Sequence, residues 1–342
     1  MIGVASAHKR VLVAGGAGFI GSHLVDRLLA SGAEVVVLDN LQTGREQNLD
    51  HLRSISAFSF VEGDIIDGLP QEVTRSRFDQ IYNLACAASP PRYQADPEHT
   101  MLTNVVGTRN LLRLAEEQGA RFLLTSTSEV YGDPEAHPQQ EGYRGWVSCT
   151  GPRACYDEGK RAAETLTFDF DRTGRAEVRV VRIFNTYGPR MDPEDGRVVS
   201  NVICQALSGE PITVYGDGTQ TRSFCYVDDL VDGLLALMAF DGEQPGPVNL
   251  GNPNELTVSD LVDRVVALTG TASPVTYRPL PQDDPRRRCP DISRAEALLG
   301  WSPKVELQQG LKATAAYFAE ELRRGPAGCF GGQGAPALAA AE

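Results

Sequence analysis

The stretch RVLVAGGAGFIGSHL, residues 10–24, decides how this chain folds. Its first five residues form a short apolar run that ends in glycines, which is typical of a buried parallel strand. A helix is expected to follow over residues 20–30. Between them, Gly15, Gly18 and Gly21 allow a tight turn, close approach of the backbone to a pyrophosphate, and close packing of helix on strand. The N–H groups at the helix start would face the phosphates, so the stretch predicts a dinucleotide site.

The rest of the first half repeats this strand-and-helix pattern. Strands and helices that alternate form a parallel sheet with helices on both faces, so the expected fold class is α/β, a Rossmann-type doubly wound sheet. Further strands are expected at 34–39, 58–63, 80–85, 121–125 and 177–184, and helices at 101–118 and 157–173.

After residue 185 the pattern changes to shorter elements with more Gly and Pro. A smaller, interleaved C-terminal domain is expected there, because a helix at 226–239 and a strand at 247–250 are expected to return to the first domain. The predicted Rossmann domain is 9–184, joined by about 222–250; the second domain is 185–221 and 251–324. The Gly- and Ala-rich residues 325–342 are expected to be a disordered tail.

The composition and charge of the chain argue against some classes of binding partner. The 342 residues suggest about two domains, and the net charge of −13 disfavours nucleic acid and anionic membranes as partners. Met1–Arg10 lacks the apolar core of a signal peptide and no apolar run is long enough to span a membrane, which favours the cytoplasm. Seven cysteines without a CxxC pair and five histidines without ligand spacing predict neither a disulfide framework nor a metal site.

Asp39, at the end of the second expected strand, indicates which dinucleotide binds. A carboxylate there accepts hydrogen bonds from a ribose 2′-hydroxyl and repels a 2′-phosphate, so NAD is favoured over NADP. Arg45 is close enough in sequence to soften that preference. Asp64-Ile65, after the third strand, is a candidate for holding the adenine, or alternatively an ordinary helix cap.

Thr127, Tyr156 and Lys160 form the candidate catalytic group. Tyr156 and Lys160 are four residues apart and share one face of the expected helix. A nearby ammonium and a cationic nicotinamide would stabilise the phenolate and lower the pKa of Tyr156. Thr127 adds a hydroxyl at the carboxyl edge of the sheet, where ligands of such sheets bind. The three predict a base that deprotonates an alcohol while hydride leaves to NAD.

With these motifs the chain resembles the extended short-chain dehydrogenase/reductases, or nucleotide-sugar epimerase/dehydratases, over about residues 10–322. The resemblance implies that the second domain binds a nucleotide diphosphate sugar. It rests on GGAGFIGSHL (15–24), TSTSEVYGDP (125–134), YDEGK (156–160), RIFNTYGPR (182–190) and VYGDGTQTRSFCYVDDL (214–230).

Within this family, Thr127-Ser128-Glu129 resembles the UDP-glucuronate decarboxylases. The related 4,6-dehydratases typically carry Asp at the position of Ser128, and the 4-epimerases usually lack the acid at 129. Three further stretches are similar to the decarboxylases: GPRACYDEGKR (151–161), DGRVVSN (195–201) and DDPRRRCP (283–290). The loop Leu84-Ala85-Cys86-Ala87 departs from the Leu-Ala-Ser-Pro that decarboxylases often have.

The implied reaction is redox-neutral. Oxidation at C4 would make a β-keto acid, loss of CO2 would leave a C5 carbanion delocalised into the ketone, and the returning hydride would give UDP-xylose. The resemblance implies that Glu129 and Arg288 act at the carboxylate end and on the C5 proton; which of them, or water, donates that proton stays open. Arg288 is equally suited to bind the carboxylate or the pyrophosphate, since guanidinium fits both.

The resemblance also implies further contacts and a homodimer built from helices near 101–118 and 157–173. Predicted NAD contacts, besides Gly15, Gly18, Gly21, Asp39, Asp64, Ile65, Tyr156 and Lys160, are Phe19, Ile20, Asn40, Thr43, Gly44, Leu84 and Ala85. Predicted substrate contacts are Ser89, Ser128, Asn185, Arg197, Val198, Asn201, Tyr215, Gln220, Arg222 and Arg288. Alternatives are a 4,6-dehydratase, a 4-epimerase, an oxidative decarboxylase that releases a UDP-4-keto-pentose, or a non-catalytic NAD-binding regulator.

Overall fold

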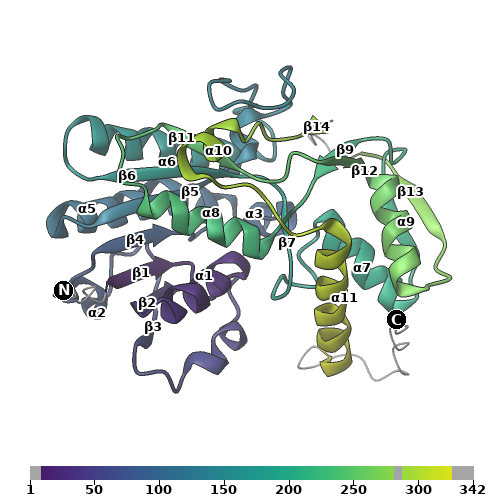
Figure 1. The fold of residues 1–342 in the computed structure, drawn as a ribbon, viewed down its shortest axis with the longest axis horizontal. Coiled ribbons are helices and arrows are strands. Elements are labelled where there is room, and N and C mark those ends of the chain that lie inside the picture. Colours follow the sequence, from purple (N-terminus) through teal and green to yellow (C-terminus); the bar gives the residue numbers. More distant parts are fainter. Residues whose placement is uncertain (1–8, 281–286, 326–342) are drawn as a thin grey trace, which may run out of the picture.

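The computed structural model describes residues 9–280 and 287–325. In this part of the chain the apolar runs pair into one parallel sheet, in the order β11-β6-β5-β4-β1-β2-β3 (Figure 1). Its strands are β1 (Arg10–Ala14), β2 (Glu34–Asp39), β3 (Phe58–Glu62), β4 (Gln80–Asn83), β5 (Arg121–Thr127), β6 (Val178–Ile183) and β11 (Pro247–Leu250). The predicted α/β class and Rossmann-type sheet are confirmed.

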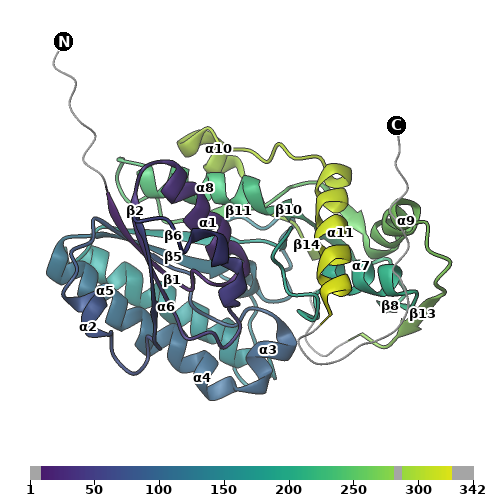
Figure 2. The same cartoon turned by 90° about the horizontal axis from the view of Figure 1, so that it is seen from below.

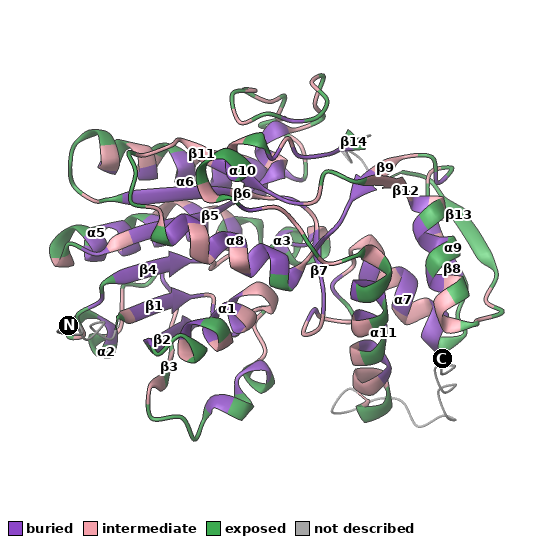
Figure 3. Ribbon diagram, in the orientation of Figure 1, coloured by how far each residue is buried: buried purple, intermediate pink, exposed green. Residues whose placement is uncertain are grey.

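Side chains that alternate along each strand build a core on both faces of the sheet. In β1, Val11 and Val13 point to one apolar cluster and Leu12 and Ala14 to another. Figure 2 shows helices on both sides of the sheet, and Figure 3 shows its strands largely buried. The first cluster is completed by α1 (Phe19–Ala30), α8 (Val227–Ala239) and α10 (Ser293–Leu299), and the second by α5 (Thr108–Gln118) and α6 (Ala154–Arg172).

The helix predicted at 101–118 is not continuous, which corrects the sequence-based boundary. The structure has α4 (Pro97–Leu102), a π-helical turn η3 (Thr103–Gly107) and then α5. The side-chain amide of Asn104 donates to the Thr100 carbonyl at 2.9 Å, the acceptor that an α-helix would reserve for the backbone. A Cβ at Gly107 would lie 2.3 Å from Ile65 Cδ1, so the turn also packs closely on the loop after β3.

A second group of elements packs beside the sheet, on the right of Figure 1. Its core joins side chains such as Val202, Leu261 and Phe318. The group contains α7 (Val198–Ser208), α9 (Val258–Thr269), α11 (Leu307–Arg324) and the parallel pair β8 (Ile212–Tyr215) and β13 (Val275–Arg278). Short strands connect it to the sheet: β7 (Thr186–Tyr187) with β10 (Cys225–Tyr226), and β9 (Thr221–Ser223) between β12 (Glu255–Thr257) and β14 (Arg287–Arg288).

The remaining described elements are short and lie in the loops of the first half. They are η1 (Glu46–Asn48), η2 (Asp50–Leu52), α2 (Gln71–Thr74), α3 (Pro90–Ala95) and η4 (Ser128–Tyr131). The strand expected at 121–125 is longer than predicted: β5 runs on to Thr127, whose side chain accepts a hydrogen bond from the N–H of Glu129. Of the predicted tail, residues 326–342 lie outside the described residues.

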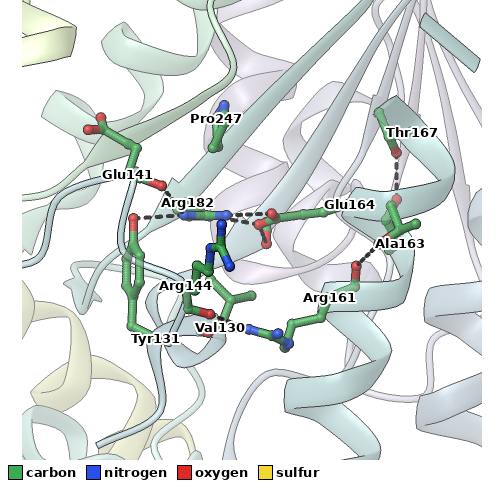
Figure 4. Close-up of polar contacts among 12 residues, drawn as sticks. Val130, Tyr131, Glu141, Arg144, Arg161, Ala163, Glu164, Thr167, Arg182 and Pro247 are labelled. Atoms are coloured by element: carbon green, nitrogen blue, oxygen red, sulfur yellow. Dashed lines mark hydrogen bonds and ion pairs between the residues drawn. The ribbon is translucent and has the colours of Figure 1, made fainter. Parts of the chain in front are cut away.

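A buried polar network fixes β5, β6 and α6 relative to one another (Figure 4). Arg182 on β6 makes two contacts with the Glu164 carboxylate on α6, at 2.9 and 2.7 Å. Ser126 Oγ on β5 donates to the same carboxylate at 2.5 Å, and Arg182 also donates to the Tyr131 hydroxyl at 3.1 Å. The buried charges are thus paired and hydrogen-bonded, and they hold the end of β5 against α6.

Candidate active site

One cavity runs along the carboxyl edge of the sheet and into the second group of elements. Every residue that the sequence analysis named for cofactor, substrate or catalysis lines it, from Gly15 in the first loop to Arg288 in β14. Their individual roles remain predictions, but the fold brings them together. Only part of the motif at 283–290 can be placed, because the structure describes its residues from Arg287 onward.

The glycine-rich turn leaves room for a ligand at the start of α1. A Cβ on Gly21 would lie 2.1 Å from the Gly15 carbonyl oxygen, and one on Gly15 would lie 2.6 Å from the Leu84 carbonyl carbon. Gly15 also has a φ of +81°, which favours glycine. No side chain caps the first turn of α1, and the residues of this turn line the cavity, so their N–H groups are available to a ligand there. This cradle fits the diphosphate of a dinucleotide.

Asp39 ends β2 inside the same cavity and is buried. Its carboxylate accepts hydrogen bonds from the N–H groups of Ala17 and Leu41, both at 2.9 Å. Burial raises the pKa of Asp39, although these two hydrogen bonds oppose the shift. Arg45 is paired with Glu321 at 2.7 Å. Its charge is therefore already engaged by a carboxylate, which supports NAD over NADP at this site.

The predicted adenine residue Asp64 belongs to a small polar group. Its carboxylate accepts from Asn40 Nδ2 at 2.6 Å and lies 2.7 Å from His99 Nε2. Burial would raise the pKa of Asp64, but hydrogen bonds from Ile66, His99 and Asn40 lower it overall. Sequence reasoning missed His99, because it comes 35 residues after Asp64 and on α4.

Tyr156 and Lys160 lie on α6 facing the end of β5, as their spacing predicts. The Thr127 side chain interacts with the Tyr156 hydroxyl and opposes the rise in the pKa of Tyr156 that burial causes. Lys160 Nζ lies 5.8 Å from the centre of the Tyr156 ring and donates to the Thr125 carbonyl at 3.0 Å. Tyr93 of α3 stacks on Tyr156 with ring centroids 4.9 Å apart and planes 4° apart.

The expected lowering of the Tyr156 pKa depends on the nicotinamide charge as well as on Lys160, and it stays a prediction. Burial raises the pKa of Tyr156 well above its ordinary value, and burial lowers the pKa of Lys160. The physical reason is that desolvation disfavours both charged forms, and the ammonium donates to a carbonyl rather than to the phenol. Cys86 packs beside Tyr156, and its sulfur accepts from Asn104 Nδ2 at 3.2 Å.

Glu129 projects from η4 directly after Thr127 and meets two arginines. Arg288 Nη2 lies 3.0 Å and Arg153 Nη2 2.7 Å from the same oxygen, Glu129 Oε2. Arg288 also donates to the Ser128 carbonyl. Burial alone would raise the pKa of Glu129, but the charges of Arg288 and Arg153 hold it well below its usual range. Glu129 is therefore an ionised carboxylate at neutral pH.

Arg153 and Asp157 were missed as functional residues. Both stand in the motif around Tyr156, but nothing in their spacing indicates that Arg153 reaches Glu129. Asp157 Oδ2 lies 3.9 Å from Arg153 Nε, and its Oδ1 is buried without a hydrogen-bond partner among the described residues. Burial and the negative charge of Glu129 raise the pKa of Asp157. Glu129, Arg153 and Arg288 line the cavity in contact with one another, and Asp157 lies next to Arg153.

The second group of elements supplies the far end of the cavity. Tyr215 ends β8 half-exposed, and Gln220 Nε2 donates to its carbonyl at 2.5 Å. Arg197 is paired with Asp195, and Asn201 Nδ2 donates to the Gly196 carbonyl at 3.0 Å. The remaining predicted substrate contacts also line the cavity, Ser89 and Ser128 from the loops of the sheet, and further along it Asn185, Val198 and Arg222.

The comparisons with known proteins identify the family. Residues 11–251 match the NAD dependent epimerase/dehydratase family. The chain belongs to this family. Its cofactor is NAD, which the glycine cradle and Asp39 fit.

Two curated proteins similar to this chain are both UDP-glucuronic acid decarboxylases. The chain is 56% identical to UDP-glucuronic acid decarboxylase 2 of Arabidopsis thaliana over 310 residues, which is 91% of this chain and 68% of the relative. It is 53% identical to UDP-glucuronic acid decarboxylase 1 of Danio rerio over 314 residues, 92% of this chain and 73% of the relative.

Solved structures of family members are similar over nearly the full length. UDP-glucuronic acid 4-epimerase from Bacillus cereus, in complex with UDP-glucuronic acid and NAD, matches with a TM-score of 0.81 and 28% identity, covering 91% of this chain and 99% of that one. UDP-glucose 4-epimerase from Thermotoga maritima, with UDP-glucose, matches with a TM-score of 0.83 and 32% identity, covering 92% and 99%.

Among the described helices, none combines the length and the apolar character needed to cross a bilayer.

One group of possible metal ligands comes together in the described part of the chain, although the spacing in sequence gave no sign of it: His137, Glu255 and Cys289. In this structure His137 is paired with Glu255 at 2.8 Å and the Cys289 thiol donates to the Pro253 carbonyl at 3.3 Å, so each already has a protein partner.

Proposed function

We propose that this chain decarboxylates UDP-glucuronate to UDP-xylose without net oxidation. The observation that carries the proposal is the ionised Glu129, held by two arginines beside the Thr127–Tyr156 pair. This arrangement places positive charge for a sugar carboxylate next to a base for a sugar hydroxyl. Identities of 51–57% to several curated UDP-glucuronic acid decarboxylases support the same substrate.

The first step removes a proton from the hydroxyl on C4 of the sugar and a hydride from C4 itself. Tyr156 takes the proton of the C4 hydroxyl, and Thr127, whose side chain interacts with the Tyr156 hydroxyl, orients the phenol oxygen. NAD, which the glycine cradle and Asp39 would hold, would supply the acceptor and later the donor of the C4 hydride. Because burial raises the pKa of Tyr156, the positive charge of Lys160, 5.8 Å from the ring, is needed to stabilise the phenolate.

The second step is loss of CO2. The 4-keto acid breaks its C5–C6 bond, and the electron pair moves into the enolate of C5, C4 and O4. The Tyr156 hydroxyl, protonated in the first step, donates to that oxygen. C5 then takes a proton. Glu129 is ionised and therefore has no proton to give, and the Arg288 guanidinium keeps its protons, so we propose that the donor is a water molecule polarised by the Glu129–Arg288 pair.

Three features of organisation belong to the same proposal. We propose that the unit around the sheet binds NAD; it consists of residues 9–184, about 222–250 and α10. The other unit, residues 185–221 and the rest of 251–324, binds the nucleotide sugar.

We propose a homodimer through the outer faces of α5 and α6, which light scattering would test. A cytoplasmic site of action is supported by the described cysteines, which are all free thiols.

Product analysis tests the function against its alternatives. Purified protein is incubated with UDP-glucuronate or UDP-glucose and catalytic NAD, and the products are identified by mass spectrometry and NMR. The proposal expects UDP-xylose from UDP-glucuronate and no conversion of UDP-glucose. UDP-galacturonate would indicate a 4-epimerase, a dehydrated 4-keto sugar from UDP-glucose a 4,6-dehydratase, and no turnover of either a non-catalytic NAD-binding protein. The variant Tyr156→Phe is the control for background conversion.

A further inference from the structure

The two arginines on Glu129 come from different parts of the fold. Arg153 immediately precedes α6, the helix that carries Tyr156 and Lys160. Arg288 belongs to β14, which pairs with β9 in the second group of elements. Both guanidinium groups contact a single oxygen, Glu129 Oε2, at 2.7 and 3.0 Å. Glu129 is therefore bridged between the catalytic helix and the substrate side of the cavity.

The surroundings of the two arginines are not equivalent. Arg153 lies between two acids, with Glu129 on one side and Asp157 Oδ2 3.9 Å from its Nε. Arg288 has only 2% of its surface exposed, and its Nε is buried without a hydrogen-bond partner in the described part of the chain. A buried donor without an acceptor is costly, so Arg288 has unused capacity for a carboxylate that enters the cavity.

An incoming substrate carboxylate creates a problem for Glu129. If Arg288 turns toward that carboxylate, Glu129 loses one partner while it stays buried. An unpaired buried charge is strongly unfavourable. Glu129 would then either become protonated or draw Arg288 away from the substrate carboxylate. Arg153 removes this conflict, because it contacts Glu129 from the helix and does not need to move.

We propose that Arg153 is a positioning residue that keeps Glu129 in place and ionised while Arg288 engages the substrate carboxylate. This inference rests on the proposed function, since it needs a sugar acid in the cavity. Asp157 takes part by holding the guanidinium of Arg153 from the other side. The charged and titratable groups that face Glu129 in the described part of the chain are Arg153 just before α6, Tyr156 and Asp157 on α6, Arg288 on β14, Arg222 on β9 and Tyr93 on α3.

The test compares Arg153→Gln and Arg153→Lys with a matched control, Arg161→Gln. Arg161 is on the same helix and donates to the carbonyls of Val130 and Arg144, at 3.1 and 2.8 Å, but does not touch Glu129 (Figure 4). UDP-glucuronate decarboxylation is measured from pH 5 to 9, with melting temperature and retained NAD as checks of folding.

The inference predicts a specific pattern. Arg153→Gln lowers kcat by about tenfold to a hundredfold, as removal of an outer partner of a reactive group commonly does, and leaves KM within about threefold. Losing that positive charge raises the pKa of Glu129, which lies well below its usual range in the wild type, so protonation of Glu129 adds a further fall to the acid limb of the kcat profile. Arg153→Lys restores part of both effects, and Arg161→Gln keeps the wild-type kcat and profile.

A double-variant cycle separates positioning from a general loss of structure. If Arg153 acts through Glu129, adding Arg153→Gln to Glu129→Gln causes little further loss of kcat. Wild-type kcat and an unmoved acid limb in both Arg153 variants would overturn the inference, as would full additivity in the cycle. Wild-type protein that converts no UDP-glucuronate would instead overturn the proposed function, and the inference with it.

Discussion

Tyr93 stacks flat on Tyr156, with the two ring planes 4° apart and their centroids at 4.9 Å. Tyr93 comes from α3, the short helix after β4, and only 1% of it is exposed. Its hydroxyl makes no hydrogen bond among the described residues. The ring, rather than the hydroxyl, therefore fixes the candidate base.

Truncating Tyr93 should release Tyr156. Tyr93→Ala is expected to lower kcat by at least about tenfold, because the catalytic phenol loses the face that orients it. Tyr93→Phe keeps the stack and should hold kcat within about threefold of wild type, with any contact of the hydroxyl to substrate showing in KM. Steady-state kinetics on the two variants decide the point. Equal losses of kcat in both would show that stacking is not what matters.

Lys160 should set the pH dependence of the reaction. Burial raises the pKa of Tyr156, so activity is expected to increase with pH as the phenolate forms. Lys160→Met removes the nearby cation and raises the pKa of Tyr156 further, which should move the rising limb of kcat/KM upward by about one pH unit or more. A limb that stays at the wild-type pH would mean that Lys160 does not tune Tyr156.

Glu129→Gln should separate cofactor binding from decarboxylation. Glutamine keeps the size of the side chain but loses the charge that pairs with Arg153 and Arg288. The variant is expected to keep its fold and bound NAD while decarboxylation slows by about a hundredfold or more. Cofactor absorbance and product formation on the same sample measure both properties, and an unchanged rate would remove Glu129 from the mechanism.

Breaking the buried Glu164–Arg182 pair should destabilise the protein. Only about a tenth of each side chain is exposed, and the two contacts measure 2.7 and 2.9 Å. Glu164→Gln leaves Arg182 buried without its counter-charge, which is expected to lower the free energy of unfolding by about 3–5 kcal/mol in urea titration. The matched control is Glu116→Gln, which breaks the exposed pair with Arg175 and should leave the midpoint almost unchanged. Similar midpoints for both variants would contradict this.

Gly21→Ala should abolish NAD binding. The added Cβ would lie 2.1 Å from the Gly15 carbonyl oxygen and force the phosphate-binding turn open. Gly142→Ala is the control, since a Cβ there meets nothing within 4 Å. Isothermal titration with NAD is expected to show binding in the control only; wild-type affinity in Gly21→Ala would mean that the turn does not hold the cofactor.

More of the fold than of the site could be predicted from the sequence. The apolar runs, the glycine spacing and Asp39 depend on neighbours close in the chain, so local patterns sufficed to place all seven strands of the sheet. The π-helical turn at Thr103–Gly107 could not be predicted, because it depends on Asn104 taking the Thr100 carbonyl and on Gly107 packing against Ile65.

The electrostatics of the site depend on contacts between distant segments. Arg153 is only three residues from Tyr156, yet its partner Glu129 lies on another loop, and Arg288 reaches the same oxygen from 159 residues away. The raised pKa of Tyr156 is a consequence of burial, which spacing alone does not reveal. Sequence therefore names the residues of the cavity, and the structure supplies their pairing.

The fate of the C4 hydrogen tests the central claim most directly. UDP-glucuronate carrying deuterium at C4 is incubated with the purified protein and catalytic unlabelled NAD, and the product is analysed by NMR and mass spectrometry while NADH absorbance is followed. The account predicts UDP-xylose that keeps the deuterium at C4, with no accumulating NADH. A UDP-4-keto-pentose without the deuterium, formed together with stoichiometric reduced cofactor, would contradict it.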